Sequence, residues 1–574
     1  MLDETQKKEI KKIVLKNALD YGKARKDSVI SKVIAKFPSL KLDMPSLSKY
    51  LDDVVFEVNK FSKQRLEEEA EEFKDTYKKE ELEKAEKSSK HNFNIEGAEK
   101  GNFITRFPPE PNGPMQLGHA KVAFTEREFA NVYEGKLALY FDDTNPETEK
   151  QEFVDNIKKD LKWLGINYDM EYYASDNIEL IYKYCEKLIA LGSAYACTCS
   201  QEDVKKSRSE NIPCKHKKHS ISENMDLWRE LLKGINSSET IIRLNYDLGA
   251  SNTSMRDPTL FRVKTATHYR QGDKYTVWPT YSFNTPITDS IKGVTDVIRS
   301  KEFELMDELY FYILEKLELR KPRIHSVARL EIKDNITSKR KINALIKEGL
   351  LWGYDDPRLV TIAGLRRRGV KPLAIKEFSL RFGMSKTESK VDISMLLNEN
   401  KKIIENHAKR LFYVENPRKL YVKNIPLEKK KMRMKVHPTL DMGYRSYTLD
   451  NVFFINSYDA NVLSENEDLR LKDAFDIKIE NIDKNEIIAT YTDKQSSTAP
   501  KVTWVNEGNF MGCTIYEIKN LLNGEEFNKN SMEIKEGLIE SYADLLSEGD
   551  IVQLEKHGFF KLDKKTERPY FISL

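Results

Sequence analysis

The segment from residue 105 to residue 120 constrains the fold most, because its Pro and Gly residues mark where one element ends and another begins. An apolar stretch ends at a pair of prolines, Gly113 permits a tight turn, and Gly118-His119 opens an amphipathic stretch. Free N–H groups at a helix start favour a phosphate, and a glycine there lets a ligand lie against the backbone. The segment therefore predicts a strand, a turn and a phosphate-binding helix start, although a lone Gly-His pair is more simply a surface turn.

Apolar periodicity divides this chain of 574 residues into regions, as expected when one domain takes about 100 to 200 residues. Residues 1–82 carry apolar residues at helical spacing, and residues 83–100 are rich in Lys and Glu, which predicts a helical domain and a charged linker. Short apolar runs alternating with amphipathic stretches predict an α/β domain over residues 101–325. Helical spacing returns over residues 326–411, and β-rich runs fill residues 412–574.

The charge balance gives no overall attraction to a polyanion. Lys and Arg number 95 against 92 Asp and Glu, a net charge of +3, so a nucleic acid would need local basic patches. Five cysteines make no disulfide framework, and no run of 18 apolar residues can span a bilayer. We expect a soluble intracellular protein.

A second segment, residues 328–342, passes from an apolar stretch into a basic loop that contains Ser338 and Lys339. Lysine suits the charge that grows on phosphoryl oxygens during phosphoryl transfer. Residues 383–389 contain a similar Ser385-Lys386 pair, but they follow a helical region instead of a strand. In isolation, either loop is more simply a solvated turn.

In this order, the two segments resemble the signatures of class I aminoacyl-tRNA synthetases of the glutamyl and glutaminyl subfamily. The first resembles the H-I-G-H signature, with Gln116 at the first histidine position, and the second resembles the K-M-S-K-S loop in its M-S-K-R form. The resemblance implies a multidomain protein with a Rossmann-type α/β catalytic domain over residues 101–325, carrying an acceptor-binding insertion over about 196–270. A helical junction domain over 326–411 and all-β anticodon-binding barrels over 412–574 would follow.

The same resemblance implies that ATP activates the substrate carboxylate, with Mg²⁺ on the phosphates. Catalytic roles fall to Gln116, His119 and Lys339. The implied ATP contacts are Pro109, Glu110, Pro111, Asn112, Gly118, His119, Arg329, Leu330, Ser338 and Lys339.

Four residues are implied to bind the amino acid. Asp142 would face its amino group and Tyr281 would line the pocket, whereas Arg299 stands where glutamyl enzymes carry arginine and glutaminyl enzymes a small residue. A guanidinium pairs with a side-chain carboxylate through two charge-assisted hydrogen bonds, which neutral glutamine cannot match. Arg299 therefore indicates glutamate, with Arg106 as a second cationic partner. Without the family pattern, an arginine at a strand end is more simply a surface residue.

Three of the five cysteines cluster. Cys197 and Cys199 are followed, after 14 intervening residues, by Cys214 and His216, a pair of two-ligand turns that suit tetrahedral Zn²⁺. The cluster falls where the acceptor-binding insertion of related synthetases begins, and some of those carry zinc there. Structural zinc and reduced, unliganded thiols remain equal alternatives.

Two basic regions are candidate tRNA contacts. Arg358 and the run Arg366-Arg367-Arg368 resemble the helical junction that meets the inner side of the tRNA, where arginines neutralise phosphates. The basic run at residues 429–435 opens the anticodon-binding region, although a charged β edge that resists aggregation would look the same.

The resemblance covers about residues 101–574 and identifies the chain as a member of the archaeal and eukaryotic type of glutamyl-tRNA synthetases. It implies a cytoplasmic, monomeric ligase that joins L-glutamate to tRNA-Glu, with tRNA-Gln open as a second acceptor and no membrane contact. The alternatives are a glutaminyl-tRNA synthetase and a non-catalytic tRNA-binding relative, which the departure at Gln116 keeps open.

Overall fold

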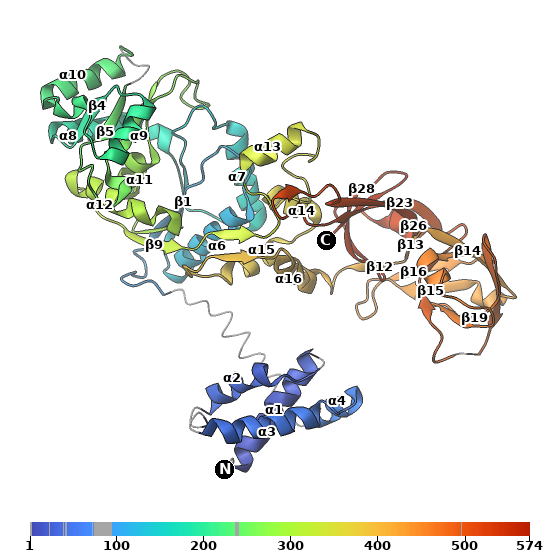
Figure 1. Ribbon diagram of the computed structural model, residues 1–574. Helices are drawn as coiled ribbons and strands as arrows, with labels where there is room; N and C mark the ends of the chain where they lie inside the picture. Colours follow the sequence, from blue (N-terminus) through green and yellow to red (C-terminus); the bar gives the residue numbers. More distant parts are fainter. Residues whose placement is uncertain are drawn as a thin grey trace. The chain divides into compact units, whose positions relative to one another are not determined.

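The computed structural model describes residues 3–21, 23–37, 40, 43–71, 73, 94–235, 240–494 and 496–574. The chain divides into two units, Met1–Asn92 and Phe93–Leu574, which are described separately below. Figure 1 labels many of their helices and strands. Of the charged linker expected over residues 83–100, residues 83–93 lie outside the described part.

The N-terminal unit consists of helices that pack around aliphatic side chains. Its described helices are α1 (Glu4–Tyr21), α2 (Lys26–Lys36), α3 (Met44–Val58) and α4 (Lys63–Glu71). On α3 the buried residues are Leu47, Leu51, Val54 and Val58, a spacing of three and four that places them on one face of the helix. The helical domain predicted from apolar spacing is therefore helical in the described residues.

A parallel sheet lies at the centre of the catalytic region. Strand β1 (Ile104–Phe107) pairs with β2 (Lys136–Phe141), which pairs with β3 (Met170–Tyr173), and both ladders are parallel. Parallel neighbours need long crossovers, which here contain α6 (Leu117–Val132) and α7 (Gln151–Leu164). Thr295 N donates to Ile104 O at 2.8 Å, and this sets the parallel pair β8 (Asp296–Ser300) and β9 (Arg323–Val327) beside β1.

An antiparallel sheet is inserted between β3 and β8. Its order is β4 (Ala194–Cys197), β5 (Ile241–Leu244), β6 (Thr259–Val263) and β7 (Val277–Pro279). The long helices of this part are α8 (Ile178–Ala190), α9 (Gln201–Glu210), α10 (Ile221–Leu232), α11 (Tyr281–Ile291) and α12 (Asp307–Lys316). Trp228 and Trp278 are fully buried in its core.

A helical region follows the parallel sheet. Strand β10 (Leu330–Ile332) pairs in parallel with β11 (Ser389–Val391). Between and after them come α13 (Lys339–Lys347), α14 (Ile362–Arg368), α15 (Pro372–Leu380) and α16 (Ser394–Ile404). The strand predicted before the basic loop is present, and the loop itself ends where α13 begins.

The C-terminal region is built from β-strands, as predicted. Two seven-stranded sheets form near-barrels (Figure 1), with orders β12-β27-β28-β29-β23-β26-β13 and β21-β18-β19-β20-β14-β17-β22. The first contains β12 (Lys409–Leu411), β13 (Tyr413–Glu415), β23 (Phe510–Ile518), β26 (Met532–Glu540), β27 (Ile551–Leu554), β28 (Gly558–Lys564) and β29 (Tyr570–Ser573). The second contains β14 (Pro417–Lys423), β17 (Val452–Asn456), β18 (Asp468–Leu471), β19 (Asp476–Ile482), β20 (Glu486–Thr492), β21 (Lys501–Val502) and β22 (Trp504–Asn506). Among the described residues, no helix has the length and apolarity needed to cross a bilayer.

Candidate active site

The two predicted phosphate motifs lie against each other. Gln116 Nε2 donates a hydrogen bond to Thr337 O at 2.8 Å, which ties the start of α6 to the basic loop before α13. The Lys339 side chain also lies across Gly113, where an added Cβ would sit 3.2 Å from Lys339 Cδ. A Cβ at position 113 would therefore push the Lys339 side chain by a few tenths of an ångström, and the structure brings both motifs together.

His119 is held in one tautomer at the start of α6. Its Nδ1 accepts a hydrogen bond from Gln116 N at 3.2 Å, so the neutral ring carries its proton on Nε2. Desolvation by the surrounding protein, and then the positive charge of Arg329, lower the pKa of His119. The neutral imidazole can thus donate from Nε2 to a phosphate oxygen.

The backbone around the first motif is anchored, and one side of it is open. Pro109 O accepts from Asp142 N at 3.2 Å, and Pro111 O accepts from Lys150 N at 3.0 Å. By contrast, a Cβ added to Gly118 would meet nothing within 4 Å. This open space beside a helix N-terminus suits a phosphate group. Of the remaining predicted ATP contacts on this segment, Glu110 is exposed and Asn112 is half-buried.

Lys339 differs from Lys386, the lysine at the matching place in the similar segment of residues 383–389. It is half-buried, with Nζ 4.9 Å from the centre of the Phe153 ring, and burial lowers its pKa. Among the described residues, no carboxylate forms an ion pair with Lys339. Lys386, in the second loop, pairs with Glu304 at 2.8 Å and is mostly exposed. Of these two lysines, Lys339 is therefore the one whose ammonium group is not paired with a described carboxylate.

The other predicted residues of the basic segment contribute in different ways. Arg329 is exposed and pairs with Glu302 at 2.9 Å, and Ser338 is exposed at the N-cap of α13. Leu330 is buried in β10, which leaves only its backbone for a nucleotide.

Arg106 is buried and makes its polar contacts within the chain. Arg106 is 1% exposed, and its Nε and Nη2 donate to the two carboxylate oxygens of Asp289 at 2.9 and 3.3 Å. Its Nη1 donates to Ile298 O at 3.4 Å. Because the charge of Arg106 is neutralised inside the chain, the geometry argues against a direct ion pair with the substrate. Arg106, on β1, instead holds α11 through Asp289 and β8 through Ile298.

Arg299, on the neighbouring strand β8, keeps an unused donor. It is 5% exposed, forms an ion pair with Asp307 and lies over the Tyr310 ring at 5.2 Å. Its Nε is buried without an acceptor in the described part of the chain. Burial raises the pKa of half-buried Tyr281, and the charges of Arg106 and Arg299 oppose that shift. Tyr281 therefore lies near both cations.

Asp142 is a half-buried carboxyl group that forms no ion pair with a described residue. Its Oδ1 has no partner among the described residues. Burial, and then repulsion from Glu149, Glu110 and Asp143, raise the pKa of Asp142 to about 8. An ammonium group placed here would supply the missing positive charge.

Three carboxylates of the site were not predicted from the sequence: Glu149, Asp289 and Asp307. Asp289 follows Tyr281 by about two turns of α11, so helical spacing could have placed it near the pocket. Glu149 is buried, and burial raises its pKa to about 9. No sequence pattern links Glu149 or Asp307 to the residues that they contact.

The cysteine cluster assembles as the ligand spacing predicted. The ligand atoms of Cys197, Cys199, Cys214 and His216 all lie within 4.8 Å of one another. Cys197 Sγ and Cys214 Sγ are 3.8 Å apart, and Cys199 Sγ lies 3.5 Å from His216 Nδ1. Tetrahedral zinc with Zn–S bonds of about 2.3 Å places two sulfurs about 3.8 Å apart. The residues therefore fit this ion.

The predicted tRNA-binding arginines are engaged in contacts within the chain. Arg358 and Arg368 are each 8% exposed. Arg358 pairs with Asp356 at 2.7 Å, and Arg368 Nε donates to Ser573 O at 3.3 Å. The donors of these two arginines therefore face atoms of this chain, whereas phosphate contacts require exposed donors.

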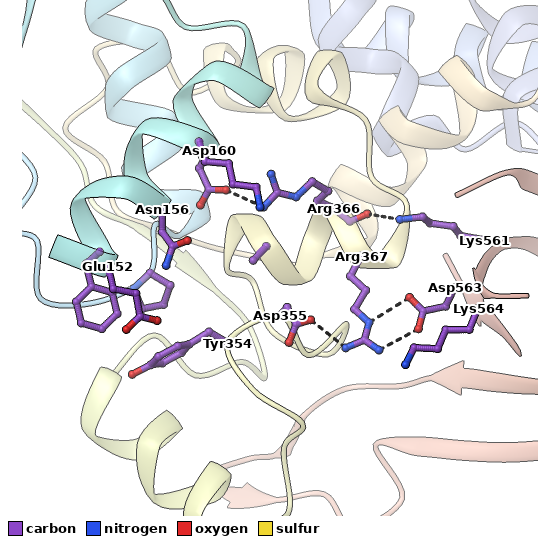
Figure 2. Close-up of a pocket in the computed structure, with 14 residues that line it drawn as sticks. Glu152, Asn156, Asp160, Tyr354, Asp355, Arg366, Arg367, Lys561, Asp563 and Lys564 are labelled. Atoms are coloured by element: carbon purple, nitrogen blue, oxygen red, sulfur yellow. Dashed lines mark hydrogen bonds and ion pairs between the residues drawn. The ribbon is translucent and has the colours of Figure 1, made fainter. Parts of the chain in front are cut away.

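Arg366 and Arg367 line a cavity of about 720 Å³ between α7, α14 and β28, which Figure 2 shows. Arg366 pairs with Asp160 at 2.9 Å. Arg367 reaches Asp563 at 2.9 Å and Asp355 at 3.0 Å. Both keep part of their surface exposed, but their first partners are carboxylates of this chain.

Comparison with known proteins agrees with this geometry. The model described as "tRNA synthetases class I (E and Q), catalytic domain" matches residues 102–407. Models described as "tRNA synthetases class I (E and Q), anti-codon binding domain" match residues 408–493 and 501–563. The helix start and the lysine loop that meet beside the parallel sheet thus lie within the catalytic domain of a class I aminoacyl-tRNA synthetase. The chain belongs to the glutamyl and glutaminyl family of that class.

Its curated relatives carry a more specific name. The glutamate–tRNA ligase of Nitrosopumilus maritimus (strain SCM1) is 37% identical over 570 residues, which cover 99% of each chain. Those of Cenarchaeum symbiosum (strain A) and Pyrococcus furiosus are 34% and 35% identical, and each match covers 97% of this chain and 98% of the relative. The predicted family is confirmed, and the chain is a ligase that forms aminoacyl-tRNA.

Proposed function

We propose that this chain activates L-glutamate with ATP and transfers it to the 3′ end of tRNA-Glu. Its relatives are glutamate–tRNA ligases, and the pocket supports the same amino acid. The observation that carries the choice of glutamate is Arg299, whose buried Nε has no acceptor among the described residues. A glutamate side-chain carboxylate would accept that hydrogen bond and carry a negative charge. The neutral amide of glutamine would leave the positive charge of Arg299 less well balanced.

The first chemical step forms glutamyl-adenylate. An oxygen of the glutamate α-carboxylate attacks the α-phosphorus of ATP, a new P–O bond forms, and the bond to the leaving pyrophosphate breaks. Negative charge grows on the phosphoryl oxygens, where Lys339 Nζ and the Nε2–H of His119 stabilise it. Mg²⁺ enters with ATP as part of the substrate. Asp142 holds the α-amino group, which orients the attacking carboxylate.

The second step transfers the glutamyl group. A hydroxyl of the terminal ribose of tRNA attacks the carbonyl carbon of the adenylate, an ester forms and AMP leaves. The two family models for anticodon binding support a role of the β-rich region in tRNA binding. Within it we propose contacts from the basic run at residues 429–435, together with tRNA phosphate contacts from the exposed parts of Arg366 and Arg367.

We further propose that Cys197, Cys199, Cys214 and His216 hold a structural Zn²⁺. Their mutual distances support the proposal. So does His216 Nε2, which lies 3.0 Å from Thr198 Oγ1, because a ligating histidine usually has its second ring nitrogen fixed by a hydrogen bond. Metal analysis of protein purified without added zinc tests this directly.

Charging assays test the main proposal. Purified tRNA-Glu and tRNA-Gln are each offered glutamate and glutamine, and we expect glutamate to be attached to tRNA-Glu. Attachment of glutamine at a comparable rate would show a glutaminyl enzyme instead. Absence of ATP–pyrophosphate exchange with tRNA present would show a non-catalytic relative. Glutamate on tRNA-Gln would extend the proposal to a second acceptor.

A further inference from the structure

A buried arginine lies behind the cysteine cluster. Arg243, on β5, is fully buried, and its Nη1 lies 3.9 Å from Cys197 Sγ and 4.0 Å from Cys214 Sγ. Its Nε donates to Asp257 O at 3.1 Å, and its Nη2 has no partner among the described residues. A buried guanidinium is costly to desolvate unless an anion balances its charge.

The neighbouring carboxylate does not balance this charge. Asp257 is buried, and Lys217 Nζ lies 2.9 Å from each of its carboxylate oxygens. Tyr195 OH and Tyr246 N also donate to Asp257, at 2.9 and 2.8 Å. Lys217 and Asp257 therefore cancel each other. In the described part of the chain, no carboxylate forms an ion pair with Arg243.

The charge of Arg243 is balanced if the cluster holds zinc. Three thiolates, one neutral imidazole and Zn²⁺ together carry one negative charge, which equals and opposes the charge of Arg243. Three neutral thiols, in contrast, would leave the buried guanidinium without a counter-ion. Arg243 faces two of the three sulfurs, which places its N–H groups where that negative charge is concentrated.

We infer that Arg243 is the counter-cation of an anionic three-cysteine, one-histidine zinc centre and that it sets the affinity of this centre for the metal. The inference rests on the proposed zinc site and goes beyond it, because it adds a positioning residue outside the ligand set. Arg243 acts through the two thiolates and makes no contact with the metal itself.

Zinc affinity of the full-length protein tests the inference. Competition with a chromophoric chelator gives the dissociation constant for the wild type, Arg243→Met and the matched control Arg256→Met. Arg256 lies in the same insertion, and its guanidinium donates to Ala250 O and Arg208 O without touching a sulfur. We expect Arg243→Met to weaken zinc binding by about 10- to 100-fold, the usual cost of losing a hydrogen-bond partner of a ligand. The control should stay within about twofold.

Two further measurements test the inference even if Arg243→Met fails to fold. Arg243→Lys keeps the charge and should keep most of the affinity. Cobalt substituted into the wild type should show charge-transfer bands of three thiolates. Equal zinc affinity of Arg243→Met and the wild type, or fewer than three thiolates on cobalt, would overturn the inference. A wild type that charges glutamate but holds no zinc would also overturn it, while leaving the ligase activity intact.

Discussion

The basic loop at Lys339 and the arginines between residues 358 and 368 look alike in sequence but differ in the structure. Both regions present clustered positive charge after an apolar stretch. Lys339 forms no ion pair with a described carboxylate and lies against the glycine of the other phosphate motif. The arginines pair with Asp356, Asp160 and Asp563 or donate to a carbonyl group.

This difference separates two uses of the same residue types. A buried cation whose charge is balanced inside the chain, such as Arg358, stabilises the contact between elements, whereas a cation that keeps an exposed or unpartnered donor is available to a phosphate. The presence of a basic cluster therefore says less about ligand binding than the partners of each cation do.

The largest expected effect is a loss of folding stability when a buried arginine loses its partner. Asp356 is fully buried and accepts from Arg358 Nε at 2.9 Å and Nη2 at 2.7 Å, so Asp356→Asn leaves a buried guanidinium unbalanced. We expect the unfolding free energy to fall by about 3–5 kcal/mol in denaturant titrations. As a control, Glu134→Gln removes an exposed pair with Lys100 and should change little. Equal stability of the two variants would contradict the structural role of Arg358.

The next effect is on catalysis. Lys339→Ala removes an electrostatic donor from the nucleotide site, and we expect ATP–pyrophosphate exchange with tRNA present to slow by about 10² to 10³. Lys386→Ala is the matched control, because Lys386 occupies the similar second loop and pairs with Glu304. Its exchange should remain near that of the wild type. A control variant as slow as Lys339→Ala would break the distinction between the two loops.

Arg299 gives a smaller effect that concerns specificity. Arg299→Leu removes the charge-assisted hydrogen bond expected for the glutamate carboxylate, worth about 1.5–3 kcal/mol. The KM for glutamate in the exchange assay should rise by roughly 10- to 100-fold, and the preference over glutamine should shrink. An unchanged preference would mean that other residues select the amino acid.

Asp142 gives the smallest effect, and it depends on pH. Because its folded pKa is raised from 3.8 to about 8, the carboxyl group stabilises the fold at low pH and loses that contribution as pH rises from about 4 through 8. Binding of an α-ammonium group should ionise it and release up to about one proton per glutamate at pH 7. Calorimetry in buffers of different ionisation enthalpy measures this release. Asp142→Asn should abolish it, and an equal release from that variant would assign the proton elsewhere.

Local features of the site were predictable from sequence. The prolines, Gly113 and Gly118 act on the backbone within a few residues, and α6 begins at Leu117, one residue before the predicted start. The cysteine cluster joins residues about 17 positions apart, so spacing alone predicted it. Both features depend on short stretches of chain.

Charge partners could not be predicted in the same way. Arg106 and Asp289 are 183 residues apart, and Arg367 and Asp563 are 196 apart. Such pairs arise only when the parallel sheet and the near-barrels are packed, and a sequence pattern does not show which carboxylate reaches which cation. The contact of Arg106 with Asp289 and that of Arg368 Nε with Ser573 O, 205 residues away, have this cause. The pair of Arg358 with Asp356 is different, because the two residues lie only two positions apart in the sequence.

The most direct test of the distinction between free and paired cations measures exchange and unfolding on the same samples of Lys339→Ala and Asp356→Asn. We expect Lys339→Ala to lose exchange at an unchanged unfolding midpoint. Asp356→Asn should lose stability while keeping near-normal exchange per folded molecule. If both variants lost the two properties together, the separation of a catalytic lysine from structural arginines would be contradicted.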